Sequence, residues 1–267
     1  MTLNALTVDV EDWPQSTLDR SWPISERALH NTRRMLALFS EGGVRATFFV
    51  QGMVTERFPE LVKEIAAAGH EVATHGHSHE LIFRLGRRAF AAELRYSVEM
   101  LEDLSGQRVL GHRAPDFSIT RESLWALEEM EALGLRYDSS IFPIHNPRYG
   151  ISDAQRFPYR WNDLIEFPIS TVRWGGVNLP VAGGGYLRLF PYAVTCWAIQ
   201  RINAQSQPAM IYVHPYELDT EELRLLGDQV PWTLRLTQGL NRGRTEAKLR
   251  ALMHDFELAP VREVLGL

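Results

Sequence analysis

The chain has 267 residues, of which 45% are hydrophobic and 23% charged, with a formal net charge of -5. This length and composition suit a globular protein with one large domain or two small ones. The acidic balance argues against non-specific nucleic-acid binding, which needs a basic face. The only cysteine, Cys196, excludes an internal disulfide.

The N-terminus enters a strand pattern almost at once, with no basic or apolar leader before it. We therefore expect no signal peptide and a cytoplasmic protein. No apolar run approaches the roughly 18 residues that a membrane span needs, so we expect no transmembrane segment. The oligomeric state is left open by the sequence.

Strand-like and helix-like segments alternate along the chain. The helical segments repeat apolar residues at helical spacing and end at glycine, as at Gly42 and Gly43. A further helix is expected to start after Ser118 or Thr120 and to end at Leu133. The other predicted helices are residues 26–40, 59–68, 88–104 and 245–254, and the predicted strands are residues 3–10, 45–50, 71–73, 109–111 and 210–213.

This alternation predicts an α/β fold in which helices cover a parallel sheet. The number of repeats favours a distorted (β/α) barrel of about seven strands, with a doubly wound open sheet as the alternative. We expect the barrel to comprise residues 1–217 and a C-terminal extension, residues 218–267, to pack on it. In either architecture, ligands bind at the carboxyl ends of the strands.

A histidine cluster follows the third predicted strand. His75, His77 and His79 lie within five residues, and Gly76 allows a short turn that aims two imidazoles at one ion. We expect His75 and His79 to bind a divalent metal and His77 to point away.

A burst of carboxylates, Asp9, Glu11 and Asp12, ends the first strand. Side chains alternate along a strand, so Asp9 and Glu11 face the same side. One of them would bind the metal while the other stays free as a base. We expect Glu11 as the third ligand, with Asp12 as the alternative. Two imidazoles and a carboxylate suit Zn²⁺ best, with Co²⁺, Mn²⁺ or Fe²⁺ as alternatives.

The order of these motifs resembles the polysaccharide deacetylases, the NodB-homology group or carbohydrate esterase family four. After the carboxylates and His-x-x-x-His come Arg113 in Arg-x-Pro, then Asp138, then a late strand that ends in His214. The resemblance covers roughly residues 3–217. It is closest to a subgroup found in exopolysaccharide gene clusters, through the segments 9–12, 183–188 and 214–217 and the C-terminal fifty residues.

The resemblance implies a role for each motif. Asp9 matches the general base, Arg113 the arginine that holds it, His214 the general acid and Asp138 the carboxylate that orients this acid. A backbone N–H near Phe117 matches an oxyanion donor.

The remaining candidates concern the substrate. We expect Trp174 and Tyr186 to contact the substrate, since aromatic rings stack on sugar faces. Arg188 is also expected to contact the substrate. The chain departs from the commoner family motif at Val10, where a second aspartate is usual. This departure brings it nearer to relatives that act on small amides or lipid-linked sugars.

These observations predict a metal-dependent N-deacetylase that removes acetyl from an N-acetylated amino sugar of a bacterial exopolysaccharide or its precursor. Without a leader, an intracellular precursor is favoured, lipid-linked or nucleotide-linked. The alternatives are a hydrolase of small cyclic amides or ureides on the same scaffold and an inactive sugar-binding relative.

Overall fold

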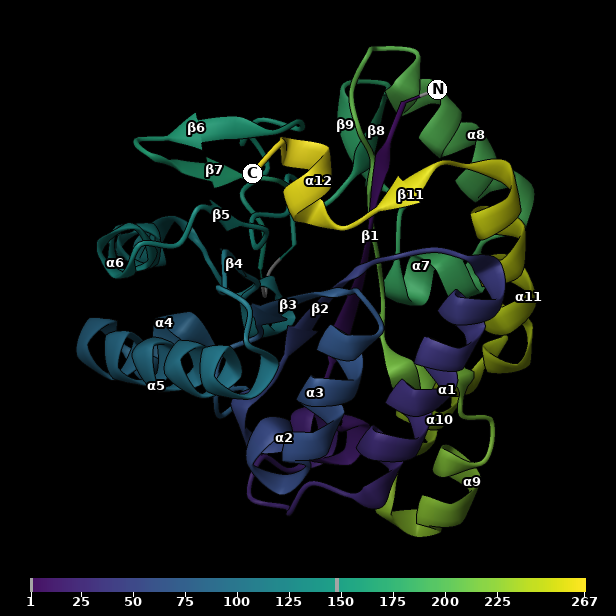
Figure 1. Ribbon diagram of the computed structural model, residues 1–267. Helices are drawn as coiled ribbons and strands as arrows, with labels where there is room; N and C mark the ends of the chain where they lie inside the picture. Colours follow the sequence, from purple (N-terminus) through teal and green to yellow (C-terminus); the bar gives the residue numbers. More distant parts are fainter. Residues whose placement is uncertain (1, 147–148) are drawn as a thin grey trace.

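A nine-stranded sheet covered by helices forms the centre of the protein (Figure 1). The computed structural model describes residues 2–146 and 149–267. Hydrogen-bonded neighbours follow the order β10-β1-β2-β3-β4-β5-β7-β6, and β11 pairs with β1. The strands of this sheet are β1 (Asn4–Val10), β2 (Thr47–Val50), β3 (Glu71–Thr74), β4 (Gly111–His112), β5 (Tyr137–Asp138), β6 (Tyr159–Trp161), β7 (Leu164–Glu166), β10 (Met210–Val213) and β11 (Leu258–Ala259).

The sheet is curled but open. In the described part of the chain, the seven neighbouring strands from β10 to β7 run parallel, and β6 joins β7 antiparallel. Among the same residues the two edge strands, β10 and β6, do not pair with each other, so the sheet is a half-barrel. The predicted α/β fold with a distorted, barrel-like sheet is confirmed, with the ring open at one side.

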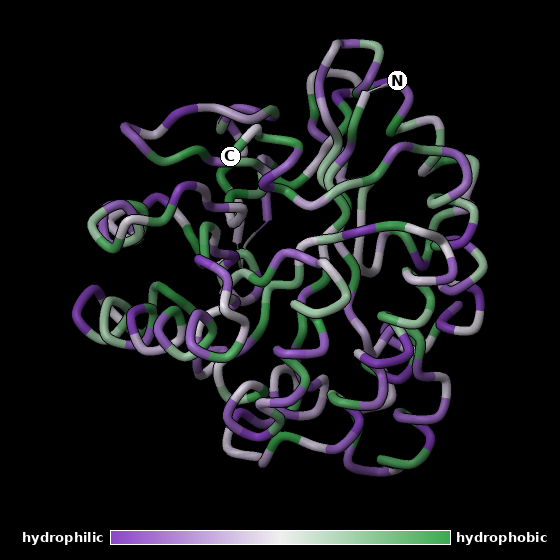
Figure 2. The backbone as a smooth tube through the Cα atoms, viewed as in Figure 1, coloured by the Kyte–Doolittle hydropathy of each residue, from purple (hydrophilic) through white to green (hydrophobic). Residues whose placement is uncertain are grey.

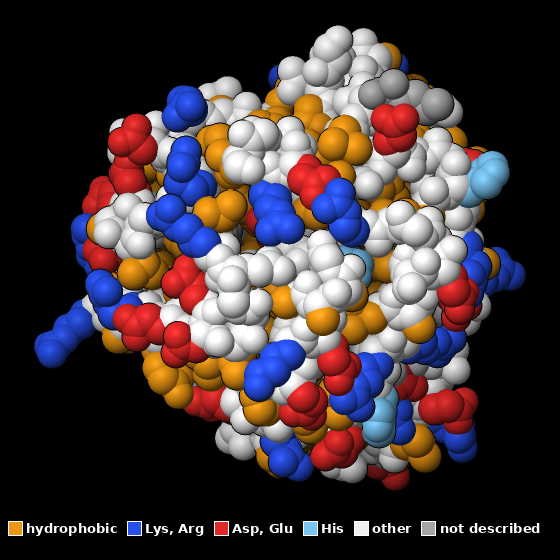
Figure 3. Space-filling view, in the orientation of Figure 1, with side chains coloured by type: hydrophobic (Ala, Val, Ile, Leu, Met, Phe, Trp, Pro, Cys, Tyr) orange, Lys and Arg blue, Asp and Glu red, His pale blue; other side chains and the backbone are white. Residues whose placement is uncertain are grey.

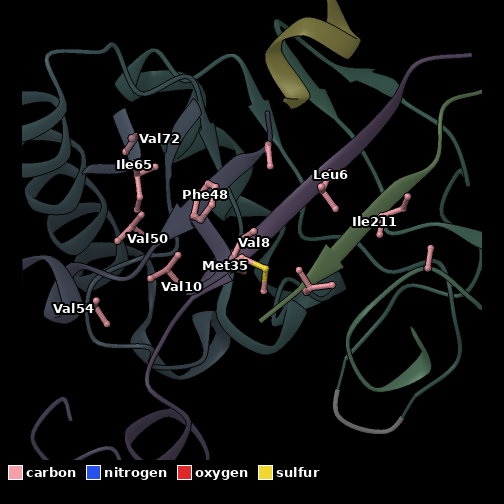
Figure 4. Packing of buried hydrophobic residues seen from close by; sticks show 14 of the residues in the cluster. Leu6, Val8, Val10, Met35, Phe48, Val50, Val54, Ile65, Val72 and Ile211 are labelled. Atoms are coloured by element: carbon pink, nitrogen blue, oxygen red, sulfur yellow. The ribbon is translucent and has the colours of Figure 1, made fainter. Parts of the chain in front are cut away.

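Strand β1 separates two apolar layers. Every residue of β1 is buried, and alternate side chains face opposite sides of the sheet. Leu6, Val8 and Val10 pack among side chains such as Met35, between the sheet and its helices (Figure 4). The intervening residues, Asp9 among them, face the other side. Strand alternation therefore places Asp9 on the side away from these helices.

Helices cover the outer face of the sheet where the sequence predicts them. Helix α1 begins after Ser25, whose hydroxyl accepts a hydrogen bond from the Arg27 N–H, and ends at Gly43 with a φ of 63°. Hydrophobic residues concentrate along the central strands and hydrophilic residues on outer turns (Figure 2). The helices before β6 are α1 (Glu26–Gly42), α2 (Gly52–Arg57), α3 (Pro59–Ala67), α4 (Ile82–Leu85), α5 (Arg87–Ser105) and α6 (Trp125–Leu133).

The glycine run at residues 183–185 opens a helix. A side chain at Gly183 would come within 2.3 Å of the Tyr212 carbonyl oxygen, so this segment lies directly against β10. Helix α7 (Gly184–Leu189) follows, and then α8 (Tyr192–Asn203), which the sequence analysis did not predict. Glycine at position 183 thus allows the start of this helix to approach the β10 backbone closely.

The C-terminal segment returns to the sheet. Strand β11 pairs with the start of β1, and α11 packs against α1 and α7. The boundary predicted at residue 217 stays a prediction. Within residues 2–146 and 149–267, no helix has both the length and the apolarity to cross a bilayer. The remaining elements are the β8 (Thr171–Trp174) and β9 (Val177–Pro180) hairpin and helices α9 (Glu222–Leu226), α10 (Trp232–Gly239), α11 (Arg242–Asp255) and α12 (Val261–Leu265).

Candidate functional site

Four polar side chains meet where four parallel strands end. Glu11 directly follows β1, His75 follows β3, Arg113 follows β4 and His214 follows β10. Because the strands are parallel, their carboxyl ends lie at the same edge of the sheet. The topology thus gathers residues that are up to two hundred positions apart in the sequence.

Glu11, His75 and His79 form a buried cluster. One ligand atom from each lies within 4.8 Å of the other two. Glu11 Oε2 is 3.3 Å from His75 Nε2 and in still closer contact with His79 Nε2. His79 has a φ of 63°, an unusual value for a residue with a side chain, so the turn after β3 is held in a specific shape.

The second nitrogen of His75 is already committed. His75 Nδ1 lies 2.9 Å from the Arg113 carbonyl oxygen, which accepts its proton. This bond fixes the tautomer and leaves the Nε2 lone pair toward Glu11, the arrangement found when a histidine binds a metal. The Arg113 backbone therefore orients this imidazole.

The donor set fits a divalent ion. Burial raises the pKa of Glu11, but the charge of His79 and the close contacts with His79 and His75 bring the pKa well below its usual range. A carboxylate between two imidazoles, all buried, matches the N and O ligands that zinc takes. Glu11, His75 and His79 are thus the residues that would hold the ion.

The two neighbouring candidates are engaged elsewhere. Asp12 accepts hydrogen bonds from the Ser25 hydroxyl at 2.6 Å and from the Ser25 N–H at 3.1 Å. His77 packs edge-on against the Tyr96 ring, with 5.1 Å between centroids. Asp12 is therefore tied to the start of α1, and His77 points away as expected.

Asp9 is held by Arg113 on the inner face of the sheet. Arg113 Nη1 donates to Asp9 Oδ1 at 2.7 Å and to the Thr7 hydroxyl at 2.7 Å, and Nη2 donates to the Ser139 hydroxyl at 2.9 Å. The guanidinium is fully buried and lies 4.2 Å from the centre of the Phe49 ring. The ion pair and packing fix the Asp9 carboxylate in one orientation beside the cluster.

His214 completes the site. Its Nε2 lies 3.9 Å from Asp9 Oδ2 and 4.0 Å from Glu11 Oε1, and its ring stacks on Tyr216 with 4.7 Å between centroids. Burial lowers the pKa of His214, but its bond to Glu217 and the charges of Glu11, Glu217 and Asp9 raise it to about 9. The imidazole is therefore a cation in this setting and has a proton to give.

The role predicted for Asp138 is wrong. His214 Nδ1 lies 2.8 Å from Glu217 Oε1, so Glu217 orients this imidazole. Asp138 instead contacts His112 Nδ1 at 2.8 Å and the Ser140 hydroxyl at 2.7 Å inside the core. Sequence reasoning missed Glu217, although its spacing of three residues from His214, across a short helical turn, was a usable signal.

A cavity of about 1000 Å³ opens over these residues. Among the described residues its lining includes Asp9, Glu11, His75, His79 and His214, with Phe117 and Arg188 at the sides, but not Trp174 or Tyr186.

Two of the predicted substrate contacts lie outside the cavity lining. Trp174 lies on β8, 63% exposed and edge-on to Trp197. The Tyr186 ring packs against Phe142 and Phe190. A stacking role fails for both because their rings are outside the cavity.

The Phe117 N–H itself donates to the Ala114 carbonyl at 3.1 Å in a 3₁₀ turn, and the oxyanion donor predicted near Phe117 stays a prediction. Arg188 does line the cavity. However, its guanidinium donates to the carbonyls of Gln238 at 2.6 Å and Thr237 at 3.0 Å, so it anchors α10.

Two family models divide the chain. Residues 15–137 match the model for polysaccharide deacetylase, and residues 139–266 match a domain of unknown function, DUF3473. A peptidoglycan deacetylase of Helicobacter pylori is 40% identical over 116 residues, which cover 42% of this chain and 37% of that protein. Residues 15–137 are therefore similar to polysaccharide deacetylases, the family that the motifs predict. Membership of the exopolysaccharide subgroup stays a prediction.

The whole chain shares its fold with solved structures. A structure from Mycobacterium smegmatis described as a polysaccharide deacetylase has a TM-score of 0.65 and 20% identity, covering 99% of this chain and 89% of that one. BA3943, a pseudoenzyme of Bacillus anthracis, has a TM-score of 0.53 and 15% identity, covering 99% and 66%. The fold is thus common to an inactive protein, and activity must be argued from the site.

The curated relatives are longer than the matched segment. The chain spans between 37% and 40% of the length of the first three of them. The substrates of these relatives can therefore support only a proposal for this chain.

Proposed function

We propose that this chain is a metal-dependent N-deacetylase that acts on an N-acetylated amino sugar of a bacterial exopolysaccharide or its precursor. The supporting observation is the Glu11–His75–His79 cluster beside a buried Asp9–Arg113 pair and a charged His214. A divalent ion at the cluster, with Zn²⁺ as the proposed metal, would supply a Lewis acid for the acetyl carbonyl. The matched relative from Helicobacter pylori is named for deacetylating peptidoglycan, which is consistent with this class of substrate.

The residues around the cluster supply the proton transfers. Asp9 takes a proton from the water molecule whose oxygen attacks the acetyl carbon. His214 donates a proton to the amide nitrogen as the C–N bond breaks, so that acetate and a free amine leave. Each such transfer contributes about 10²–10⁴ in rate. Arg113 positions Asp9, and Glu217 positions His214, through the bonds described above.

The cavity suits a short sugar segment. Its volume of about 1000 Å³ stands at the upper end of small-ligand sites, and its floor holds the reacting groups. An acetamido group at the floor would leave room for neighbouring sugar units above it.

Acetate release from N-acetylglucosamine oligomers by the purified chain tests the reaction. We expect turnover to stop after exhaustive chelation and to return with added Zn²⁺ or Co²⁺. Turnover that persists without metal would refute metal dependence. Ring opening of allantoin or an imide, with no acetate release from the oligomers, would favour the cyclic-amide alternative.

Two matched variants test the ligand set. Glu11→Gln removes a ligand charge from the cluster, so we expect the variant to lose most of its bound metal. Asp12→Asn alters an acid that contacts Ser25 instead, so its metal content should match that of the wild type. Elemental analysis that gives the reverse pattern would assign the metal to Asp12.

A further inference from the structure

Helix α10 presents an apolar face that no described residue covers. Trp232 and Leu236, four residues apart on the helix, are 74% and 60% exposed. Leu240, directly after the end of α10, is 50% exposed, and Leu225 on the preceding α9 is 59% exposed. Residues at this spacing share one side of a helix. An exposed cluster of one tryptophan and three leucines is unusual on a free surface.

The opposite side of α10 belongs to the cavity. Leu234 and Gln238 line the cavity that holds the metal ligands. Leu234 also packs on an apolar cluster that includes Trp13, Tyr216 and Val230. Arg188 anchors the helix through its last carbonyls. One short helix thus has its outer face apolar and its inner face at the rim of the proposed active site.

The charged side chains near the apolar face of α9 and α10 do not indicate a charged binding partner. The nearest cations already have acidic partners, Arg224 with Glu221 and Arg235 with Asp228 at 3.3 Å. Positive and negative side chains are also interspersed over the face of the molecule in Figure 3. Attraction to an occupant must therefore come from the apolar side chains.

The size of the face favours a lipid layer over a second copy of the chain. Four such side chains expose a few hundred Å² at most, whereas a stable dimer buries roughly 800 Å² on each partner. Tryptophan and leucine on one side of a helix beside a polar body are, in contrast, the composition of helices that lie in the membrane interface.

We propose that the outer face of α9 and α10 docks on the surface of a lipid bilayer. Docking would bring one wall of the cavity close to the bilayer surface, since Leu234 and Gln238 of the same helix line the cavity. If the proposed deacetylation is correct, the substrates would then be N-acetylated sugars held at a membrane. The docking itself does not depend on the reaction.

Co-flotation of the purified full-length chain with neutral phosphatidylcholine vesicles tests this docking. We expect the wild type to float with the vesicles and to do so similarly at low and high salt, because the nearby arginines are paired. The double variant Trp232→Ala/Leu236→Ser should bind at least about tenfold more weakly, since two large apolar side chains are lost. Trp174→Ala is the matched control, because Trp174 is similarly exposed but lies on β8, outside the cavity lining.

The outcomes separate docking from catalysis. The double variant should deacetylate a soluble oligomer at the wild-type rate, so an inactive wild type would count against the proposed function and not against docking. Failure of the wild type to float, or an equal loss in Trp174→Ala, would overturn the docking proposal. So would a dimer in analytical ultracentrifugation that the double variant abolishes, because the occupant would then be a second copy.

Discussion

His214 and His112 each contact a carboxylate through Nδ1 at the same distance, 2.8 Å. His214 pairs with Glu217 at the cavity, and its side chain is 15% exposed. His112 pairs with Asp138 in the core, where both side chains are fully buried. The two histidine–carboxylate pairs have the same contact distance. They differ in the residues that surround them.

The surroundings set opposite charges on the two imidazoles. Burial lowers the pKa of both. For His112 the bond to Asp138 does not offset burial, so its pKa stays below the usual value. For His214 the bond to Glu217 is joined by the charges of Glu11 and Asp9, and its pKa rises to about 9. His214 gains from two further carboxylates, whereas the charges of His75 and Arg113 lower the pKa of His112 further, so the charged groups around each pair decide which histidine carries a transferable proton.

Among the changes near His214, loss of the Asp9 charge should have the largest effect on activity. We expect Asp9→Asn to lower kcat at least about a hundredfold, because amide nitrogen cannot accept the proton from water. Metal content should be unchanged, since Glu11, His75 and His79 remain. Loss of the metal in this variant would show that Asp9 is a ligand.

A smaller loss of activity should follow from Glu217→Gln. This change keeps a hydrogen-bonding group beside His214 but removes the charge that favours the imidazolium, so we expect kcat to fall about ten- to a hundredfold with KM little changed. Glu217→Asp should recover part of the rate. Steady-state kinetics of both variants would contradict the positioning role if Gln and Asp behaved alike.

Asp138→Asn tests the core pair by stability. Asp138 contacts His112 and accepts two hydrogen bonds from Ser140, all buried. We expect this variant to lose about 2–3 kcal/mol of unfolding free energy, because asparagine keeps one acceptor oxygen and turns an NH₂ group toward the buried donors of the other. The folded fraction should keep most of its kcat. Urea denaturation with kinetics at a temperature below the transition separates the two effects, and a large fall in kcat with normal stability would restore Asp138 to the catalytic site.

Glu222 extends the comparison to a buried carboxylate paired with an arginine. Burial raises its pKa from 4.5 to about 7, although Arg242, at 2.8 Å, acts in the opposite direction. The folded state then binds more protons than the unfolded state between about pH 4.5 and 7. This group's contribution to stability is therefore present below pH 4.5 and is lost as the pH rises toward 7.

The expected effect of Glu222→Gln is correspondingly modest. The stability difference between wild type and Glu222→Gln should change by about 1–2 kcal/mol from pH 5 to pH 8, in the direction that favours the wild type at pH 5. Denaturation of both proteins at the two pH values measures it. Parallel pH profiles would mean that Glu222 is ionised in the folded protein throughout.

Local pattern was enough to predict the sheet and the centre of the site. The apolar run at residues 210–213 matches β10, and alternation along the first strand correctly placed Asp9 and Glu11 near one another. Both inferences depend only on the period of a strand and on where it ends. Helix α5 was likewise readable from its apolar spacing.

Contacts in space were harder to predict than strands and helices. Asp138 ends β5 and Glu217 follows β10, and no spacing in the sequence indicates that the Asp138 side chain lies in the core. The Phe117 N–H is used in a local 3₁₀ turn. Trp174 lies in a stretch whose pattern favours short strands and loops, and only the structure shows that it stands on an exposed hairpin.

Arg113 serves the site with two parts of one residue. Its backbone carbonyl anchors the imidazole of His75, while its guanidinium holds Asp9. Side-chain substitution reaches only the second of these bonds. Replacement of Arg113 by lysine or by a neutral residue of similar shape would therefore change the basicity of Asp9. The backbone carbonyl at position 113 would continue to orient His75.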